Sequence, residues 1–314
     1  LIYRMRILTI LGPTASGKTS LAIKIAKLLD GEIISLDSRQ IYKGMEIGTA
    51  QPTEIELSMI PHHLIGFRSP EYSIAAGEYV DLVTSKIKEV KMKEKIPIIC
   101  GGAGLYYRAL DKGIFRGSIS DLKVRERIER EYDYNSEILY QKLEKIDPEY
   151  FRIVHINNKK RLVRALEIFE ITGKVPSEHF KKQQKGQKKE LDLFTIFLEW
   201  ERQALIDRIE DRTKNMLNNG WIDEVKTLLQ EQSNMNVSYT ALNSIGYSQI
   251  KEYLAGKIGY IEMEEDIIIK TRQFSRKQTQ WFSKESINLI IEMGNMLDEN
   301  ISLIISELYQ NIKR

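Results

Sequence analysis

Residues 12–19 have the sequence GPTASGKT and match the pattern G-x-x-x-x-G-K-[ST] at full spacing. They follow the apolar run Ile7–Leu11, which predicts a buried strand, and precede Ser20–Leu29, which has the composition of a helix. In this strand, loop and helix order, backbone N–H groups and the helix N-terminus turn toward an anion. Lys18 adds positive charge, and the hydroxyl of Thr19 is a ligand for Mg²⁺. The segment predicts a phosphate-binding loop, whichever molecule carries the phosphate.

The rest of the N-terminal half alternates short apolar runs with helix-like segments. Such alternation predicts an α/β fold, in which helices cover a parallel sheet and ligands collect at the carboxyl ends of its strands. The strand candidates are Ile7–Leu11, Glu32–Leu36 and Ile96–Cys100, and the helix candidates are Ser20–Leu29 and Ala75–Lys93.

The pattern changes after Gly113, which indicates a second unit. Long charged segments with helical periodicity follow, and no further strand candidate appears before Leu193–Leu198. We predict an all-helical insertion over residues 117–192, and a phosphate-loop core made of residues 1–116 and 193–314. From Arg202 onward we expect helices only. The helix candidates of the insertion are Leu122–Tyr132, Glu137–Lys145 and Lys159–Thr172.

The charge of the chain is unevenly distributed. Its net charge is only +3, but residues 159–189 hold ten Lys or Arg side chains against three Glu, a local charge of +7. A cluster of this kind neutralises nucleic-acid phosphates in some proteins and forms a solvated helix face in others. Charge alone therefore leaves both interpretations open.

Composition also limits the cellular setting. No apolar stretch approaches the roughly 18 residues that a membrane-spanning helix needs. The single cysteine, Cys100, cannot form an internal disulfide, and we interpret it as a packing residue. We expect a cytoplasmic protein. His62 and His63 are adjacent on an extended segment, so their side chains point to opposite faces and favour structural roles over a metal site.

Three further features lie close to the phosphate loop in the predicted layout. Asp37 ends the strand candidate Glu32–Leu36, where its carboxylate can hold Mg²⁺ through water, act as a general base, or cap the following turn. The glycines of Gly101–Gly104 allow a close approach between backbone and ligand. Arg208 and Arg212 lie one helical turn apart and so on one helix face, where they can reach a diphosphate; taken alone, such a pair is more typical of surface charge.

Several blocks together carry a resemblance to a known family. Beside GPTASGKT, they are DSRQIY at 37–42, GTAQP at 48–52, HHL at 62–64, GGAGLY at 101–106, RLVRALE at 161–167, IGY at 245–247 and TRQ at 271–273. The chain resembles the tRNA dimethylallyltransferase family, also called isopentenyl-tRNA transferases, over nearly its whole length. The phosphate loop alone is generic, but its combination with the other blocks is specific.

The resemblance implies a reaction. A dimethylallyl group passes from dimethylallyl diphosphate to the exocyclic amine of adenosine 37 in tRNA, and diphosphate leaves. Asp37 would accept the proton that the amine loses, while Lys18, Thr19 and Arg212 stabilise the leaving group, with Mg²⁺ on Thr19 as the only cofactor. The implied diphosphate contacts are Gly12, Thr14, Ala15, Ser16, Gly17, Lys18, Thr19 and Arg212.

The resemblance also implies how the tRNA is held. The substrate would be the exposed adenosine of an anticodon stem-loop, flipped into a pocket, and we expect a monomer acting on one tRNA. The implied tRNA contacts are Asp37, Ser38, Arg39, Gln40, Ala103, Arg125, Lys160, Arg161, Arg164, Gly246, Tyr247, Arg272, Gln273, Arg276, Lys277 and Gln278.

Three positions depart from the family pattern. Ala103 stands where Thr is common, Gln51 where Lys is usual, and Gly66 where Asp is usual. We expect a working enzyme that is slower or handles its substrates differently. The rival class is a P-loop kinase for a small molecule or nucleotide, and a third is an RNA-binding protein without activity. The kinase gives the DSRQIY and GTAQP blocks no purpose.

Overall fold

The computed structural model describes residues 6–113, 121–179, 181, 191–294 and 298–313. The chain forms two compact units: Leu1–Asp111 together with Leu191–Arg314, and Lys112–Glu190, which interrupts the first unit in sequence. The predicted boundary at 116/117 lies outside the described residues, as do Lys182, Lys185, Lys188 and Lys189 of the basic cluster.

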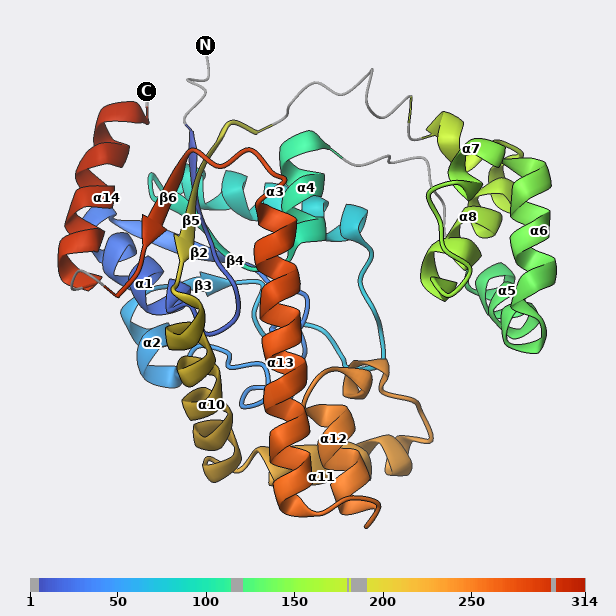
Figure 1. The fold of residues 1–314 in the computed structure, drawn as a ribbon. Coiled ribbons are helices and arrows are strands. Elements are labelled where there is room, and N and C mark those ends of the chain that lie inside the picture. Colours follow the sequence, from blue (N-terminus) through green and yellow to red (C-terminus); the bar gives the residue numbers. More distant parts are fainter. Residues whose placement is uncertain (1–5, 114–120, 180, 182–190, 295–297, 314) are drawn as a thin grey trace. The chain divides into compact units, whose positions relative to one another are not determined.

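The first unit is built on a six-stranded sheet in the order β3-β2-β4-β1-β5-β6 (Figure 1). All neighbouring strands run parallel, so the predicted α/β fold is confirmed. The expectation that only helices follow Arg202 is wrong at β6, which pairs with β5. The strands are β1 (Ile7–Leu11), β2 (Gly31–Leu36), β3 (His62–His63), β4 (Ile96–Gly101), β5 (Leu193–Glu199) and β6 (Leu289–Glu292).

Helices cover both faces of this sheet, as the fully buried residues of β1 and β4 require. One face packs against α1 and α14, where Leu21, Ile25 and Tyr309 join a common core. On the other face, Tyr107 of α4 bonds to Thr195 of β5 and meets the ring of Phe282 at the end of α13. The helices are α1 (Lys18–Leu29), α2 (Glu54–Met59), α3 (Ala76–Met92), α4 (Gly104–Lys112), α10 (Arg202–Asn218), α11 (Trp221–Met235), the 3₁₀ helix η1 (Thr240–Asn243), α12 (Tyr247–Leu254), α13 (Tyr260–Phe282) and α14 (Asp298–Ile312).

Every described element of the second unit is helical. Each helix begins at a side chain that caps it, Asp121, Asn135, Asp147 and Asn158 in chain order, because an Asp or Asn oxygen accepts a backbone N–H of the first turn. The helices enclose a separate apolar core that includes Leu143. They are α5 (Leu122–Tyr134), α6 (Ser136–Ile146), α7 (Pro148–Phe151) and α8 (Lys159–Thr172). No helix among the described residues of the chain is long and apolar enough to cross a membrane.

Candidate active site

A cavity of about 890 Å³ lies in the first unit at the carboxyl ends of the strands. It is lined by the phosphate loop, by residues that follow β2 and β4, and by side chains of α10 and α13. A parallel sheet brings these segments together because its strands end at one edge. The predicted loop, Asp37 and the glycines after Cys100 therefore share one cavity.

The phosphate loop has the backbone that an anion cradle needs. Gly17, which precedes α1, has a φ of +81°, and Ala15 has a φ of +64°, a conformation that costs an alanine about 1 kcal/mol. No side chain caps the N-terminus of α1 at Gly17. A side chain at Gly12 would come within 2.5 Å of Ser16 Oγ, itself a buried hydroxyl with no hydrogen-bond partner among the described residues. Strain and unpaired donors together favour a ligand here.

The two arginines of α10, which their spacing places on one helix face, both reach this loop. Arg208 Nε donates to Ala15 O at 2.8 Å, and Arg212 Nη1 donates to Thr14 Oγ1 at 3.1 Å. The guanidinium group of Arg208 also lies 4.3 Å from the ring of Trp200. The helix thus holds two positive charges against one side of the loop.

The cations of the cavity bond only to neutral oxygens among the described residues. Lys18 Nζ donates to Pro13 O at 3.0 Å, and Arg212 donates to the hydroxyl of Thr14. Burial lowers the pKa of both groups, while Asp37 acts in the opposite direction on each. Cations that lose water without gaining a paired carboxylate are arranged to receive an anion.

Asp37 follows β2 and faces the same cavity. Its Oδ1 accepts the backbone N–H groups of Arg39 at 2.7 Å and Gln40 at 3.3 Å. The capping role, one of three alternatives for Asp37, is therefore real for this oxygen. Oδ2 makes no hydrogen bond in the part of the chain that the structure describes, so it is available to a substrate. Ser38, Arg39, Gln40 and Ala103 line the cavity beside it.

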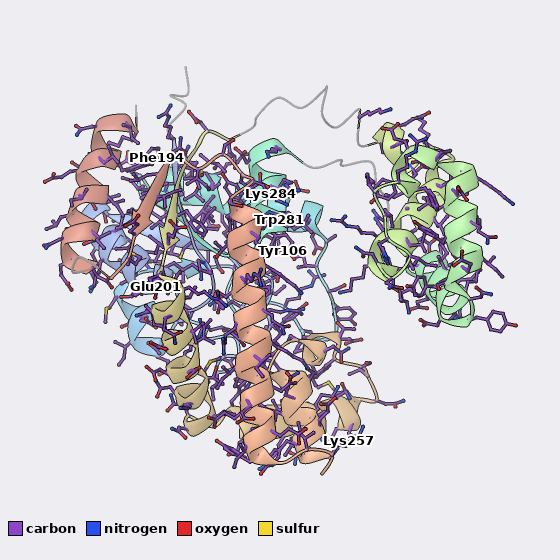
Figure 2. All side chains as sticks on the ribbon, in the orientation of Figure 1. Tyr106, Phe194, Glu201, Lys257, Trp281 and Lys284 are labelled. Carbon is purple, nitrogen blue, oxygen red and sulfur yellow. The ribbon has the colours of Figure 1, made fainter. Side chains whose placement is uncertain are left out.

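Gln278 of α13 links two loops of the site. Its Oε1 accepts the N–H of Thr14 at 2.8 Å and its Nε2 donates to Gly102 O at 2.9 Å, with 8 % of the residue exposed. Trp281 lies one turn further along α13 (Figure 2). An added Cβ at Gly104 would come within 2.4 Å of its ring. The family resemblance implied that Gln278 contacts tRNA and did not predict its bond to Thr14. The two residues are 264 positions apart, and no local sequence pattern links them.

Comparison with known proteins shows the family of the chain. A family model described as "IPP transferase" matches residues 40–285. The chain belongs to the IPP transferase family. It is 38 % identical to the tRNA dimethylallyltransferase of Sulfurihydrogenibium sp. over 93 % of this chain and 94 % of that protein. It is 40 % identical to the enzyme of the same name from Bacillus cytotoxicus, over 89 % of this chain and 87 % of that protein.

Solved structures of IPP transferases share the fold. The full-length tRNA isopentenylpyrophosphate transferase of Bacillus halodurans matches with a TM-score of 0.70 and 32 % identity, covering 98 % of this chain and 96 % of that one. A eukaryotic dimethylallyltransferase solved while acting on tRNA matches with a TM-score of 0.83 and 25 % identity, covering 98 % and 80 %. The family predicted from the motifs is confirmed, and the kinase interpretation finds no support.

The C-terminal residues expected to meet tRNA divide into two groups. Gln273, Arg276 and Lys277 are exposed on α13, and Arg272 is partly exposed. Tyr247 differs, because it is 1 % exposed and its hydroxyl donates to Glu224 at 2.7 Å. Gly246, with a φ of +88°, lies against the ring of Trp221. The first group forms a basic surface, while Tyr247 lines the cavity and Gly246 packs against Trp221 beside it.

In the second unit, two of the residues expected to contact tRNA, Arg125 and Arg164, bond to the carboxylate of Glu167. Glu167 Oε2 accepts from Arg125 Nη2 at 3.0 Å and from Arg164 Nη1 at 2.6 Å, and its side chain is 0 % exposed. Burial acts against ionisation, but hydrogen bonds from Arg164 and Arg125 outweigh it and lower the pKa of Glu167. Lys160 and Arg161 are exposed on the same helix, α8.

Two of the departures from the family pattern lie side by side. Gln51 Nε2 donates to Tyr42 O at 2.7 Å, and a Cβ at Gly66 would lie 3.1 Å from Gln51 Oε1. The positions where the family usually has Lys and Asp are therefore neighbours, and both charges are absent here together. A joint loss removes an opposite-charge pair without leaving an unpaired charge.

The remaining polar candidates have structural partners. His63 Nε2 bonds to the buried Glu32 at 2.6 Å, and His62 Nδ1 bonds to Ile60 O at 2.8 Å. Burial raises the pKa of the Cys100 thiol to about 12, which keeps it protonated and unreactive.

Proposed function

We propose that this protein transfers a dimethylallyl group from dimethylallyl diphosphate to the exocyclic amine of the adenosine at position 37 of tRNAs, releasing diphosphate. One observation carries the proposal: a phosphate loop shares its cavity with Asp37 and with two cations that, among the described residues, hydrogen-bond to no carboxylate. The tRNA dimethylallyltransferases that the chain resembles support the choice of donor and acceptor.

The loop would bind the leaving group rather than a nucleotide to be hydrolysed. Charge builds up on the diphosphate as its bond to the allylic carbon lengthens, and Lys18 and Arg212 lie where they can stabilise that charge. Ser16, with its buried and unpartnered hydroxyl, is a further donor. Because these groups are fixed before substrate arrives, little reorganisation is needed during the reaction.

Asp37 would serve the acceptor. The adenine amine is a weak nucleophile because its lone pair is delocalised into the ring, so it must lose a proton as it attacks. A new bond forms between this nitrogen and the allylic carbon, the carbon–oxygen bond breaks, and its electron pair leaves with the diphosphate. The proton passes to Asp37 Oδ2, while Oδ1 stays bonded to the backbone of Arg39 and Gln40.

A magnesium ion fits the donors near the loop. Mg²⁺ binds through one or two protein oxygens, with substrate phosphates and waters completing its shell. Thr19 supplies such an oxygen at the cavity, and the described residues include no cluster of three or more His, Cys, Asp or Glu that would suit another metal. We propose Thr19 as its protein ligand. When bound, the ion would neutralise part of the diphosphate charge.

The tRNA would be held through its anticodon stem-loop. The exposed cations of α13 and α8, Arg276, Lys277, Lys160 and Arg161, would meet backbone phosphates, and Ser38, Arg39 and Gln40 would lie near the flipped base. We propose a cytoplasmic enzyme acting as a monomer on one tRNA at a time.

The experiment is mass spectrometry of nucleosides after incubating an anticodon stem-loop RNA with dimethylallyl diphosphate and Mg²⁺. We expect the native protein to yield prenylated adenosine. Asp37→Asn should lower the turnover number by about 10²- to 10⁴-fold, because it removes the proton acceptor. Its affinity for dimethylallyl diphosphate should change little, since Lys18 and Arg212 remain.

Asp30→Asn is the matched control. This aspartate ends α1, pairs with Lys95 and has an exposed side chain, so its loss should leave turnover unchanged. Phosphate transfer from ATP to an acceptor, with no prenylated nucleoside, would support a kinase and contradict the proposal.

A further inference from the structure

Glu224, in the first turn of α11, holds a segment of backbone at the wall of the cavity. Its Oε2 accepts the N–H of Ile47 at 2.6 Å, and its Oε1 accepts the N–H of Gly48 at 3.0 Å. Oε1 also accepts the hydroxyl of Tyr247 at 2.7 Å. Both oxygens of one carboxylate are thus committed to a turn that is 176 positions away in sequence.

The fit between this turn and α11 is close. A Cβ at Gly48 would come within 1.9 Å of Trp221 Nε1 and 2.5 Å of the Tyr247 hydroxyl, so no other residue could take its place without moving the ring. Trp221 and Tyr247 contact each other edge to face, with centroids 5.6 Å apart. The close packing and the two hydrogen bonds to Glu224 therefore fix the position of this turn against α11.

The same turn bonds to the segment that carries the proposed base. Gln40 Nε2 donates to Ala50 O at 2.8 Å, and Gln40 Oε1 accepts from Ser35 Oγ at 3.2 Å. The backbone N–H of Gln40 donates to Asp37 Oδ1 at 3.3 Å. A continuous set of contacts thus runs from Glu224 through the turn to Gln40, and from Gln40 to Asp37.

We propose that Glu224 is a positioning residue for Asp37, acting through residues 47–50 and the side chain of Gln40. The proposal rests on the proposed function in taking Asp37 as the base. Glu224 does not line the cavity, whereas Thr49, Ala50 and Gln40 do. Its hydrogen-bond partners Ile47, Gly48 and Tyr247 are on the acceptor side of the site, and in the part of the chain that the structure describes it makes no hydrogen bond to the phosphate loop.

Glu224→Gln tests this with a small change of shape. The amide keeps one acceptor oxygen but leaves one of the two backbone N–H groups without a partner, so the turn loosens. We expect the turnover number to fall about 10-fold, with the KM for dimethylallyl diphosphate unchanged. A rise in that KM equal to the fall in turnover would overturn the proposal, because it would mean a general loss of structure.

Two variants accompany it. Asp223→Asn makes the same chemical change one residue earlier, at an exposed side chain paired with Lys226, and should leave turnover unchanged. Tyr247→Phe removes one of the three bonds to Glu224 and should lower turnover by only about 2- to 3-fold. A larger effect from Asp223→Asn than from Glu224→Gln would contradict the assignment.

A double-mutant cycle with Gln40→Ala tests the route. If Glu224 acts through Gln40, the second substitution adds little, and the double variant should be within about 2-fold of the slower single variant. Multiplication of the two separate losses would show that the residues act independently and would overturn the route.

Hydrogen exchange by mass spectrometry gives a readout that does not depend on activity. In Glu224→Gln we expect faster exchange in peptides covering 46–50 and 37–41, and unchanged exchange in the peptide covering 12–19. Unchanged exchange at 37–41 would overturn the proposal, even if the native enzyme is fully active. Failure of the native protein to prenylate RNA would instead overturn the proposed function and leave this test of the contacts intact.

Discussion

The two units of the molecule place their positive charges in opposite ways. In the first unit, Lys18 and Arg212 line a cavity and bond to the neutral oxygens of Pro13 and Thr14. In the second unit, Arg125 and Arg164 share the buried carboxylate of Glu167. Both pairs of cations are partly buried, but among the described residues only the second pair is hydrogen-bonded to a carboxylate of the protein.

This difference distinguishes a ligand-binding site from a structural cluster of charges. Partly buried cations that are not hydrogen-bonded to a carboxylate cost free energy in the ligand-free protein, and that cost is recovered when an anion binds. Cations that share a buried carboxylate are fixed in place with or without a ligand, and the cluster keeps one net positive charge. The first arrangement is suited to grip and release a diphosphate, and the second to present a preformed surface to an RNA backbone.

Within this comparison of the two units, the largest expected effect comes from removing a cation that has no carboxylate hydrogen-bonded to it among the described residues. Lys18→Met should lower turnover by about 10²- to 10³-fold, because one electrostatic contact to the leaving group is lost. The folded state lowers the pKa of Lys18, so the charged form is disfavoured by folding, and this penalty disappears only as pH rises toward the unfolded value. At neutral pH we therefore expect the ligand-free variant to unfold at the same temperature as the native protein or higher.

Lys24→Met is the control for this variant, because Lys24 lies on the same helix but pairs with Glu299 at 2.6 Å. It should keep full turnover. Thermal unfolding with and without diphosphate completes the measurement, and diphosphate should stabilise the native protein but not Lys18→Met. A Lys18→Met protein that is destabilised without ligand would remove the contrast between the two units.

In the second unit, removing a charge should lower the stability of the protein instead of leaving it unchanged or raising it. Glu167→Gln leaves two guanidinium groups without their shared carboxylate, and we expect local stability to fall by about 3 kcal/mol. The folded state lowers the pKa of Glu167, so its contribution is present above the unfolded pKa and is lost as pH falls through the folded one. The difference between native and variant should be constant near neutral pH and shrink below about pH 4.

Amide hydrogen exchange of α8 in the whole protein measures this local stability. Glu170→Gln, on the same helix, is the comparison, since Glu170 is partly exposed and its pairing with Arg127 is a surface contact. It should cost less than about 1 kcal/mol. Equal losses from the two variants would mean that Glu167 is not the centre of the cluster.

Local patterns predicted much of this molecule, while distant contacts escaped prediction. The bounds of β1 and α8 are those expected, because apolar runs and helical periodicity are properties of neighbouring residues. The strand β6 was not predicted because it is only four residues long. Its side chains alternate between partly buried and exposed, and none is fully buried. It pairs with β5 only because the chain returns from α13 to the edge of the sheet.

The site divides along the same line. The spacing of Arg208 and Arg212 placed both on one helix face, and both reach the phosphate loop. The roles of Gln278 and Glu224 depend on partners more than 170 positions away, and neither residue stands out in its own stretch of sequence. Family resemblance pointed to Gln278 but could not show that its amide bonds to the protein itself.

Of the changes to the cavity considered in this comparison, substitution of Ala103 should alter turnover least. Ala103 lies between β4 and α4 on the cavity wall. Its C=O accepts the N–H of Tyr107 at 2.9 Å, so it begins the helix, and a threonine hydroxyl there would cap α4. We expect Ala103→Thr to change turnover by less than about 5-fold, because Lys18 and Arg212 already meet the charge of the leaving group and a neutral hydroxyl adds one weaker bond. Valine has the shape of threonine without the hydroxyl, so Ala103→Val distinguishes the effect of the helix cap from the effect of a larger side chain. The threonine variant should be about 1 kcal/mol more stable than the valine variant. A native protein without measurable turnover that Ala103→Thr restores would show that the two cations are not sufficient, and that this neutral donor belongs to the machinery.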